Sequence, residues 1–293
     1  MSGRRDTISY INLARQITIV ENELKGHQQI LSTLPINLNT PVIGITGPPG
    51  SGKSTLVNAL IKSILQKNKT VGIVAVDPSS PFNYGALLGD RIRMNDFFNN
   101  ENVFIRSVAS RGSLGGLSDK IIEITDVMRA ANFDYIFVET VGVGQSEVEI
   151  AGLADISIVV LNPGAGDDVQ MIKAGILEIA NIFVINKADK VGANNLEQFL
   201  LKLVQNNSKL NETPILKTIA TAFDGIDVLL SVIEEQHAKN KNFDKKAMLL
   251  TNKILHLIQK KQTAKINKRA LYRHILESIG EGNFNLYQLL NKF

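Results

Sequence analysis

The feature that most constrains the fold of this chain is a glycine-rich segment between two regular elements. Residues 47–54 read Gly-Pro-Pro-Gly-Ser-Gly-Lys-Ser, which satisfies the spacing G-x-x-x-x-G-K-[ST] in full. An apolar run at 42–46 precedes the segment, and residues 55–66 have the apolar spacing of a helix. In this strand, loop and helix context the spacing is typical of a phosphate-binding loop, because glycines let successive backbone N–H groups turn inward. The chain is therefore predicted to build a nucleotide-binding domain around it.

Individual residues of this loop have distinct predicted roles. The ammonium of Lys53 is expected to neutralise the β and γ oxygens of a bound nucleotide, and the hydroxyl of Ser54 is expected to ligate Mg²⁺. The N-terminus of the following helix adds a partial positive charge. The remaining predicted nucleotide-binding positions of the loop are Gly50, Ser51, Gly52 and Thr55.

Short apolar runs alternate with helical patterns from residue 41 onward. Continuous runs rich in β-branched residues indicate strands that are buried on both faces, as in a mostly parallel sheet. The predicted class is a doubly wound α/β fold in which ligands bind beyond the carboxyl ends of the strands. The predicted strands are 42–46, 71–76, 103–108, 135–138, 156–161, 182–185 and 215–219.

Helical patterns flank this region and suggest three parts. Residues 1–40 are predicted to form a helical N-terminal extension, residues 41–235 the nucleotide-binding domain, and residues 236–293 a helical C-terminal extension. The last part carries 12 Lys and Arg against 3 Asp and Glu, whereas the preceding residues carry 20 against 25. The basic residues lie among aliphatic helix positions, which favours a solvated helix face, with a dimerisation arm as one candidate use.

Composition excludes several classes of site. The chain has no cysteine, so disulfides, thiolate zinc sites and cysteine nucleophiles are excluded, and its 4 histidines are widely dispersed. The longest apolar runs fall well short of the roughly 18 residues that a membrane-spanning helix needs. The N-terminal residues have no apolar core typical of a secretion signal and include several acids, so the expected location is the cytoplasm.

A second motif predicts which base is bound. Asn186-Lys187-Ala188-Asp189 directly follows the predicted strand 182–185. A carboxylate at Asp189 can accept hydrogen bonds from both N1–H and the N2 amino group of guanine, and adenine lacks this pair of donors. A tetrapeptide alone could simply begin a helix, but its place after a phosphate-binding loop, on the next-but-one strand of the same edge, favours GTP.

Two strand-end carboxylates are candidates for metal binding and catalysis. Glu139 ends one apolar run, where an acid can hold Mg²⁺ through water or orient the attacking water. Asp77 ends another run and opens a stiff Asp-Pro-Ser-Ser-Pro turn, so it is a candidate metal ligand or a helix cap. Spacing alone leaves Asp90 equally ambiguous.

Together these segments resemble the MeaB/ArgK-type GTPases, the methylmalonyl-CoA mutase-associated proteins. The resemblance covers approximately residues 41–235 and is carried by GPPGSGKST, VDPSSP, GDRIRM, SRGSLGGLS, ETVGVGQSE and NKAD. It implies a GTPase that binds an adenosylcobalamin-dependent acyl-CoA mutase, such as methylmalonyl-CoA mutase, and gates the loading or protection of its cofactor. Apart from the resemblance, the helical C-terminal extension is a candidate dimerisation arm, and a homodimer is the expected assembly.

The resemblance adds roles for particular residues. It places the Mg²⁺ and switch residues at Ser54, Asp77, Asp90 and Glu139, and it makes Lys173 similar to a lysine that reaches the nucleotide when the partner is bound. The predicted catalytic set is therefore Lys53, Asp77, Glu139 and Lys173. One departure is the guanine-capping loop, which is Ser-Ala in the family and Ile219-Ala220 here. The backbone N–H of Ala220 can still meet guanine O6.

Three other functions are weighed against this one. A metal-inserting GTPase chaperone would need a His- or Cys-rich site, and the chain has neither a cysteine nor a histidine cluster. A small-molecule kinase would not need the guanine preference. A binding module that GTP merely stabilises, with incidental hydrolysis, stays open. Nucleic acid is not favoured as a partner, because the basic C-terminal helices lack interleaved aromatic residues.

Overall fold

A computed structural model describes residues 9–77, 94–97, 99–109, 120–140, 146–164, 176–208, 210, 212–239, 243–282 and 284–290. Within this part of the chain, seven strands form one sheet in the order β3-β2-β4-β1-β5-β6-β7, and every neighbouring pair is parallel. The strands are β1 (Val42–Thr46), β2 (Val71–Asp77), β3 (Val103–Ala109), β4 (Tyr135–Glu139), β5 (Ile156–Leu161), β6 (Ile182–Asn186) and β7 (Ile215–Thr218).

The predicted fold class and all seven predicted strands are confirmed. The strands of the sheet's centre are buried along their whole length, which is why their sequences are continuous apolar runs. The last strand ends one residue before the predicted limit. Ile219 leaves the sheet and instead forms an antiparallel bridge with Asp224, which closes a loop.

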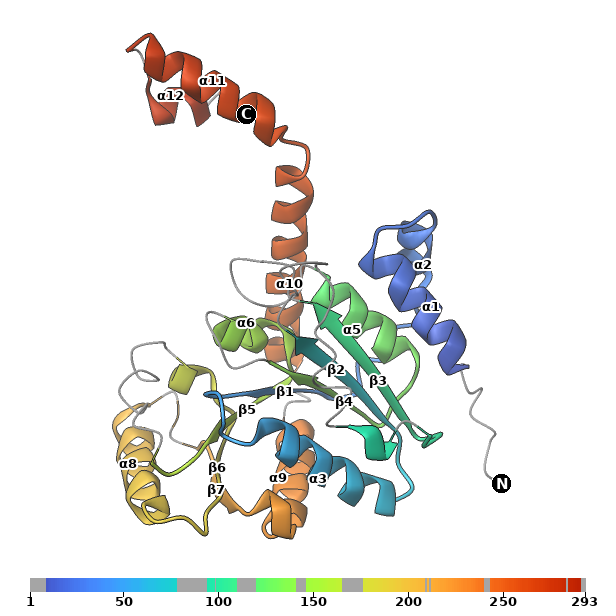
Figure 1. Ribbon diagram of the computed structural model, residues 1–293, viewed down its shortest axis with the longest axis vertical. Coiled ribbons are helices and arrows are strands. Elements are labelled where there is room, and N and C mark those ends of the chain that lie inside the picture. The colour runs from blue at the N-terminus through green and yellow to red at the C-terminus, as the bar shows by residue number, and fades with distance from the viewer. Residues whose placement is uncertain are drawn as a thin grey trace. The chain divides into compact units, whose positions relative to one another are not determined.

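Helices cover both faces of the sheet (Figure 1). Two of them, α3 (Lys53–Gln66) and α9 (Ile226–Lys239), pack on one face and share a core with the side chains of Ile43, Phe137 and Ile158. The opposite face is covered by α5 (Ile121–Ala130), α6 (Ser146–Leu153) and α8 (Ala193–Asn206). The short 3₁₀ helices are η1 (Asn95–Phe97), η2 (Ile176–Ile179) and η3 (Ala220–Ala222).

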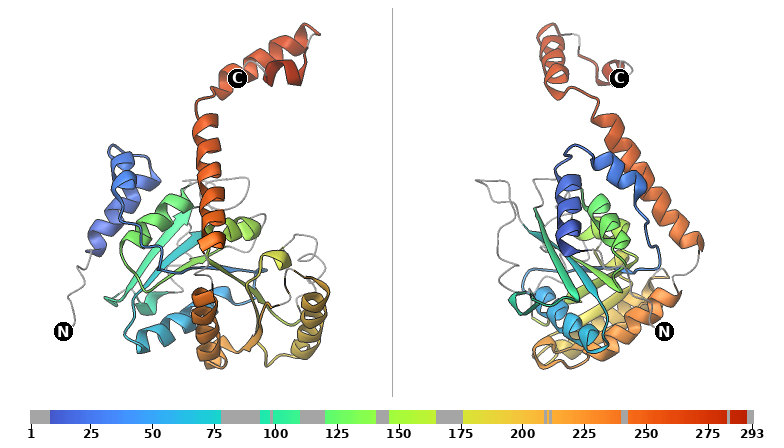
Figure 2. Two further views of the ribbon diagram at one scale, coloured as in Figure 1. Left: turned by 180° about the vertical axis from the view of Figure 1, so that it is seen from behind. Right: turned by 90° about the vertical axis from the view of Figure 1, so that its right-hand side faces the viewer.

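The N-terminal helices are part of this layered core. They are α1 (Tyr10–Glu21) and α2 (His27–Thr33), and α1 lies beside α5 in both views of Figure 2. Leu13, Ile17 and Val20 recur at helical spacing and are almost fully buried. Arg106 of β3 also pairs with Glu21 at the end of α1. The helical N-terminal segment thus completes the cover of the sheet.

Two compact units divide the chain, residues 1–246 and 247–293. The second unit contains most of α10 (Phe243–Thr263), together with α11 (Lys268–Gly280) and α12 (Leu286–Leu290), which confirms its helical character. Asn267 caps α11, because its side chain accepts hydrogen bonds from the N–H groups of Arg269 and Ala270. Among the described helices, none combines the length and the apolar character that crossing a bilayer requires.

Two polar clusters lie at the amino edge of the sheet, where the strands begin. In the first, the guanidinium of Arg129 on α5 pairs with Asp155, which directly precedes β5. The same carboxylate oxygen of Asp155 accepts the backbone N–H of Val42, the first residue of β1, at 2.9 Å. Arg129 is 1% exposed. This buried pair therefore joins one helix to the starts of two central strands.

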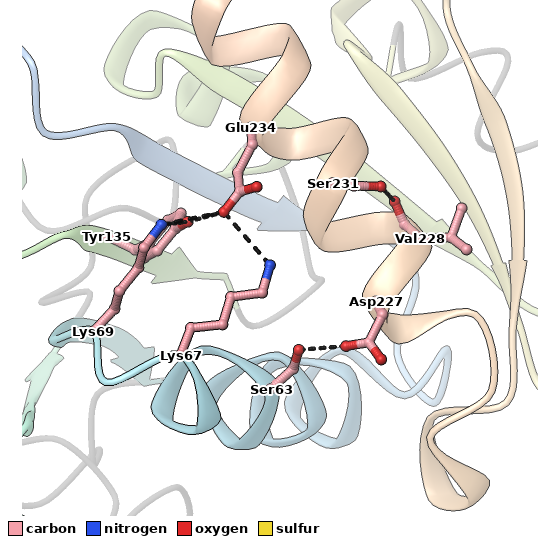
Figure 3. Close-up of polar contacts among 8 residues, drawn as sticks. All are labelled: Ser63, Lys67, Lys69, Tyr135, Asp227, Val228, Ser231 and Glu234. Atoms are coloured by element: carbon pink, nitrogen blue, oxygen red, sulfur yellow. Dashed lines mark hydrogen bonds and ion pairs between the residues drawn. The ribbon is translucent and has the colours of Figure 1, made fainter.

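The second cluster ties the far end of α9 to the start of β4 (Figure 3). The Tyr135 hydroxyl donates to Glu234 at 2.6 Å, and the ammonium of Lys69 lies 3.0 Å from the Tyr135 oxygen and 3.3 Å from Glu234. Lys67 lies 3.7 Å from the same carboxylate. Burial, reinforced by the hydrogen bond to Glu234, raises the pKa of Tyr135 to about 12.

This cluster predicts a loss of stability at high pH. Because the folded pKa of Tyr135 lies above its usual value of 10.0, its contribution is complete below pH 10 and is lost as the pH rises toward 12. About 1–2 kcal/mol of the free energy of unfolding should disappear across this window. Urea unfolding at several pH values measures it. The Tyr135→Phe variant should be less stable at pH 8 and should lose less stability from pH 10 to 12; equal losses in both proteins would contradict this assignment.

Candidate functional site

The loop between β1 and α3 is shaped by glycines at which no other residue fits. Gly47 has a φ of 137°, and a Cβ there would lie 2.1 Å from the carbonyl oxygen of Val160 on β5. Gly52 has a φ of 91°, and a Cβ there would lie 2.4 Å from the side-chain nitrogen of Asn186 at the end of β6. The loop is therefore packed directly against the carboxyl ends of β5 and β6.

Lys53 is the first residue of α3, and its ammonium lies within this loop. Its Nζ donates to the carbonyl oxygens of Gly47 at 2.8 Å and Pro48 at 3.0 Å. The residue is only 7% exposed, so a cation is held in a largely desolvated position beside the helix N-terminus. Such a position suits phosphate oxygens, because the lysine charge and the helix dipole both favour an anion.

Ser54 and Glu139 come together from different elements. The Ser54 hydroxyl donates to Oε1 of Glu139 at 2.6 Å. Glu139 is the last residue of β4 and is 4% exposed, and the sheet register places it beside Ile45 of β1 and Ala75 of β2. A hydroxyl and a carboxylate are oxygen ligands of the kind that Mg²⁺ prefers. This pair is thus a candidate metal site next to the phosphate-binding loop.

Only part of the predicted metal and catalytic set can be placed. Asp77 ends β2 two residues beyond the position opposite Glu139, so its backbone reaches the same edge of the sheet. The side chain of Asp77 lies outside the described residues, and so do Asp90 and Lys173. Within the described part of the chain, no three His, Cys, Asp or Glu residues gather closely enough to hold a metal ion.

Asn186 links the phosphate-binding loop to the loop that follows β7. Its side-chain nitrogen donates to the carbonyl oxygen of Ser51 at 3.0 Å. Its side-chain oxygen accepts the hydroxyl of Thr218 and the backbone N–H of Ala220, each at 3.2 Å. Asn186 is 2% exposed, so all of these bonds are shielded from water. The amide therefore fixes the two loops against each other.

The two residues that flank Ala188 occupy the rim of the site. Lys187 has a φ of 57°, and its Nζ donates to the carbonyl oxygen of Gly50 at 2.7 Å. The backbone N–H of Ala188 donates to the carbonyl oxygen of Thr218 at 3.1 Å. Asp189 follows in a turn and is exposed. Its carboxylate is therefore accessible to a ligand at the edge of the sheet.

Two contacts were not foreseen from the sequence. The N–H of Ala220, predicted to meet guanine, donates within the protein to Asn186, so its contact with guanine stays a prediction. Thr140 is buried, and its N–H donates to the carbonyl oxygen of Ile45 at 3.1 Å, which holds the residue after Glu139 against β1. No local pattern in the sequence around Ala220 or Thr140 identifies the residue that accepts its backbone N–H.

The arrangement has the dimensions of a nucleotide site. The phosphate-binding loop follows β1, and the Asn186 turn follows β6, which is the second strand along. Strands lie about 4.8 Å apart, so the ends of β1 and β6 are separated by roughly 10 Å, a separation that a nucleotide can span. The end of β1 is also where the strand order reverses, which is the usual ligand position in doubly wound sheets. The site can therefore hold phosphates near Lys53 and a base near Asp189.

Comparisons with known proteins agree with this geometry. The model of the family described as methylmalonyl-CoA mutase-associated GTPase MeaB matches residues 13–273. A Pyrococcus abyssi protein named as a GTPase is 50% identical over 228 residues, which cover 76% of this chain and 70% of that protein. GTPase ArgK of Escherichia coli is 44% identical over 182 residues, covering 60% and 55% of the two chains.

One solved structure extends the likeness to most of the fold. The crystal structure of a protein described as LAO/AO transport system kinase matches with a TM-score of 0.72 and 26% identity. The match covers 97% of this chain and 92% of that one. The similarity therefore includes the helical regions that flank the sheet as well as the nucleotide-binding core.

Proposed function

Because the chain belongs to the MeaB family of methylmalonyl-CoA mutase-associated GTPases, we propose that it hydrolyses GTP to gate cofactor delivery to an acyl-CoA mutase. The mutase would be one that depends on adenosylcobalamin, and the gating would load or protect that cofactor. The observation that carries the nucleotide half of this proposal is the amide of Asn186, which joins the phosphate-binding loop to the loop carrying Ala220. The proposal that an acyl-CoA mutase is the partner rests on membership of the family.

Selection of GTP over ATP is proposed to lie with Asp189 and its neighbours. The carboxylate of Asp189 is accessible and can accept both guanine donors, which adenine cannot supply. A site that is built to pair with such donors rejects the analogue that lacks them by a large factor. The ammonium of Lys187 donates to the carbonyl oxygen of Gly50, so its side chain links the turn that carries Asp189 to the phosphate-binding loop.

A Mg²⁺ ion fits the chemistry of the residues beside the phosphates. The Ser54 hydroxyl and the Glu139 carboxylate lie in hydrogen-bond contact, and we propose that they hold the ion together with Asp77 and Asp90. When bound, the ion would neutralise charge on the β and γ phosphates. Lys53 would bind the same oxygens from the loop side, and Glu139 would orient the attacking water. Lys173 is proposed to stabilise charge in the transition state when the partner is bound.

Hydrolysis in the presence of a partner tests the gating role. Purified protein should release phosphate from GTP slowly and from ATP not at all, and an adenosylcobalamin-dependent acyl-CoA mutase should accelerate GTP turnover. The Lys173→Ala variant should keep nucleotide binding and lose the acceleration, whereas Lys53→Ala should lose both. If no such mutase changes the rate, the gating role is wrong. If Lys173→Ala responds like the native chain, that lysine has no part in turnover.

The described residues support neither a metal-inserting GTPase nor a module that GTP only stabilises. A metal-inserting GTPase would need a cargo site, and the described part of the chain has no cluster of three metal-binding side chains. For a module that GTP only stabilises, the buried lysine and the Ser54–Glu139 pair would have no catalytic purpose. Mutase-dependent acceleration separates this module from the proposed function.

We propose that the second compact unit makes the chain a homodimer. The helices of this unit expose large apolar side chains at helical spacing, which would be covered by the same surface of a second copy. The mass of the full chain in solution measures this state. The exposed residues include Ile254, Leu255 and Ile258 on α10 and Tyr272, Leu276 and Ile279 on α11.

A further inference from the structure

Two neighbouring helices each adjoin one of the loops that form the nucleotide site. Helix α3 begins at Lys53, directly after the phosphate-binding loop, and α9 begins at Ile226, six residues after Ala220. The helices pack against each other through a shared core that includes Leu60 of α3 and Leu229 of α9. The distance between the two loops therefore depends on how α9 sits against α3.

The loop before α9 has little freedom to absorb a shift of that helix. Ile219 and Asp224 form a bridge in which the N–H of Ile219 donates to the carbonyl oxygen of Asp224 at 3.0 Å. Ala220 lies inside this closed loop, and only Gly225 separates the bridge from α9. A movement of the first turn of α9 would consequently displace the backbone of Ala220.

One polar contact joins α3 to this first turn of α9 (Figure 3). The hydroxyl of Ser63 donates to Oδ1 of Asp227 at 2.6 Å, and Ser63 is 5% exposed. Asp227 is the second residue of α9, where a carboxylate also interacts favourably with the helix dipole. Seven residues further along the same face, Glu234 makes the separate contacts to Tyr135 and Lys69. The two ends of α9 are thus held by independent polar contacts.

We propose that Ser63 is a positioning residue for the guanine base, acting through Asp227 on the loop that carries Ala220. Asn186 holds that loop against the phosphate-binding loop from the carboxyl edge of the sheet, and the Ser63–Asp227 bond holds it from the helix side. Both are needed to keep the Ala220 backbone at a fixed distance from the phosphates. The inference rests on the proposed binding of GTP at this site and names the element that sets affinity for the base.

The Ser63→Ala variant tests the inference through ligands that do or do not carry a base. Losing one hydrogen bond of this kind should weaken GDP and GTP binding about 3- to 10-fold. Affinity for pyrophosphate, which reaches only the phosphate-binding loop, should not change. The KM for GTP should rise, while kcat at saturating GTP stays within about twofold of the native value. Asp227→Asn retains an acceptor oxygen and should bind GDP more tightly than Asp227→Ala.

Two control variants separate positioning from a general loss of stability. Ser231→Ala removes an exposed hydroxyl of α9 that donates within its own helix, to the carbonyl oxygen of Val228, and should change neither Kd nor Tm. Glu234→Gln weakens the contacts at the other end of α9 and should lower Tm while leaving the Kd of GDP unchanged. These controls lie on the same helix as Asp227 (Figure 3).

Three outcomes would overturn the inference. The first is a Ser63→Ala protein with a lowered Tm and native affinity for GDP, which would make the contact purely structural. The second is an equal loss of pyrophosphate and GDP affinity, which would place the effect at the phosphate-binding loop. In either case the proposed GTPase function stands. If the native chain binds neither GDP nor GTP, the proposed function fails and this inference fails with it.

Discussion

Replacing Lys53 with alanine should lower the rate of GTP hydrolysis by roughly 10²- to 10³-fold, the range seen when one preorganised charge-stabilising group is removed. The native ammonium is buried within the phosphate-binding loop and is held by the carbonyl oxygens of Gly47 and Pro48. Alanine removes the hydrogen bonds to those two carbonyl oxygens and leaves the phosphates without the cation that neutralises them. On the full chain, phosphate release measures the change in the rate of hydrolysis, and the Kd of GTP measures the change in nucleotide affinity.

A matched control is Lys202→Ala on α8, which removes an exposed helical lysine. Its turnover and nucleotide affinity should equal those of the native chain. Comparable activity in the Lys53→Ala protein would show that hydrolysis does not take place at this loop. A Tm within a few degrees of the native value would establish that the loss of activity is not a loss of folding.

Replacing Asp155 with alanine should produce the largest loss of stability among single side chains at the amino edge. The change leaves the guanidinium of Arg129 almost fully buried without its carboxylate and removes the acceptor for the N–H of Val42. Breaking a buried pair in this way typically costs about 3–5 kcal/mol, because the remaining charge is not compensated. The midpoint and slope of urea unfolding measure the change.

An exposed ion pair provides the comparison for this experiment. The carboxylate of Asp96 lies 3.3 Å from the ammonium of Lys62, and the two side chains are 71% and 43% exposed. Asp96→Ala should therefore change the free energy of unfolding by less than about 1 kcal/mol. If Asp155→Ala and Asp96→Ala were equally mild, the Arg129 pair would contribute nothing beyond a surface contact.

The sheet could be predicted because its information is local. The central strands β1, β4, β5 and β6 are apolar runs that are buried on both faces, so their pattern needs no knowledge of the neighbouring strands. The outer strands β3 and β7 are only partly buried, yet their apolar residues still mark them as strands. The phosphate-binding loop is equally local, since its glycines, Lys53 and Ser54 lie within eight consecutive residues. Local patterns of this kind also predicted that an acid would end β4.

Contacts that depend on which strands are neighbours could not be predicted in this way. Asn186 was recognised by its motif, yet its partners Ser51 and Ala220 lie 135 and 34 residues away in the chain. Only the strand order brings these loops together, and the sequence does not state that order. The burial of α1 against α5 and the bond from Ser63 to Asp227 have the same origin.

The separation of polar clusters between the two edges of the sheet bears on how this protein can be engineered. Among the described residues, Lys53, Ser54 and Glu139 are proposed for chemistry and lie at the carboxyl edge, whereas the contacts at the start of the strands are made by Arg129, Asp155, Tyr135 and Glu234. A five-residue strand spans roughly 17 Å, so substitutions at one end need not disturb the geometry at the other. Libraries directed at the amino edge could raise heat tolerance while preserving catalytic competence, and the two traits can be selected independently.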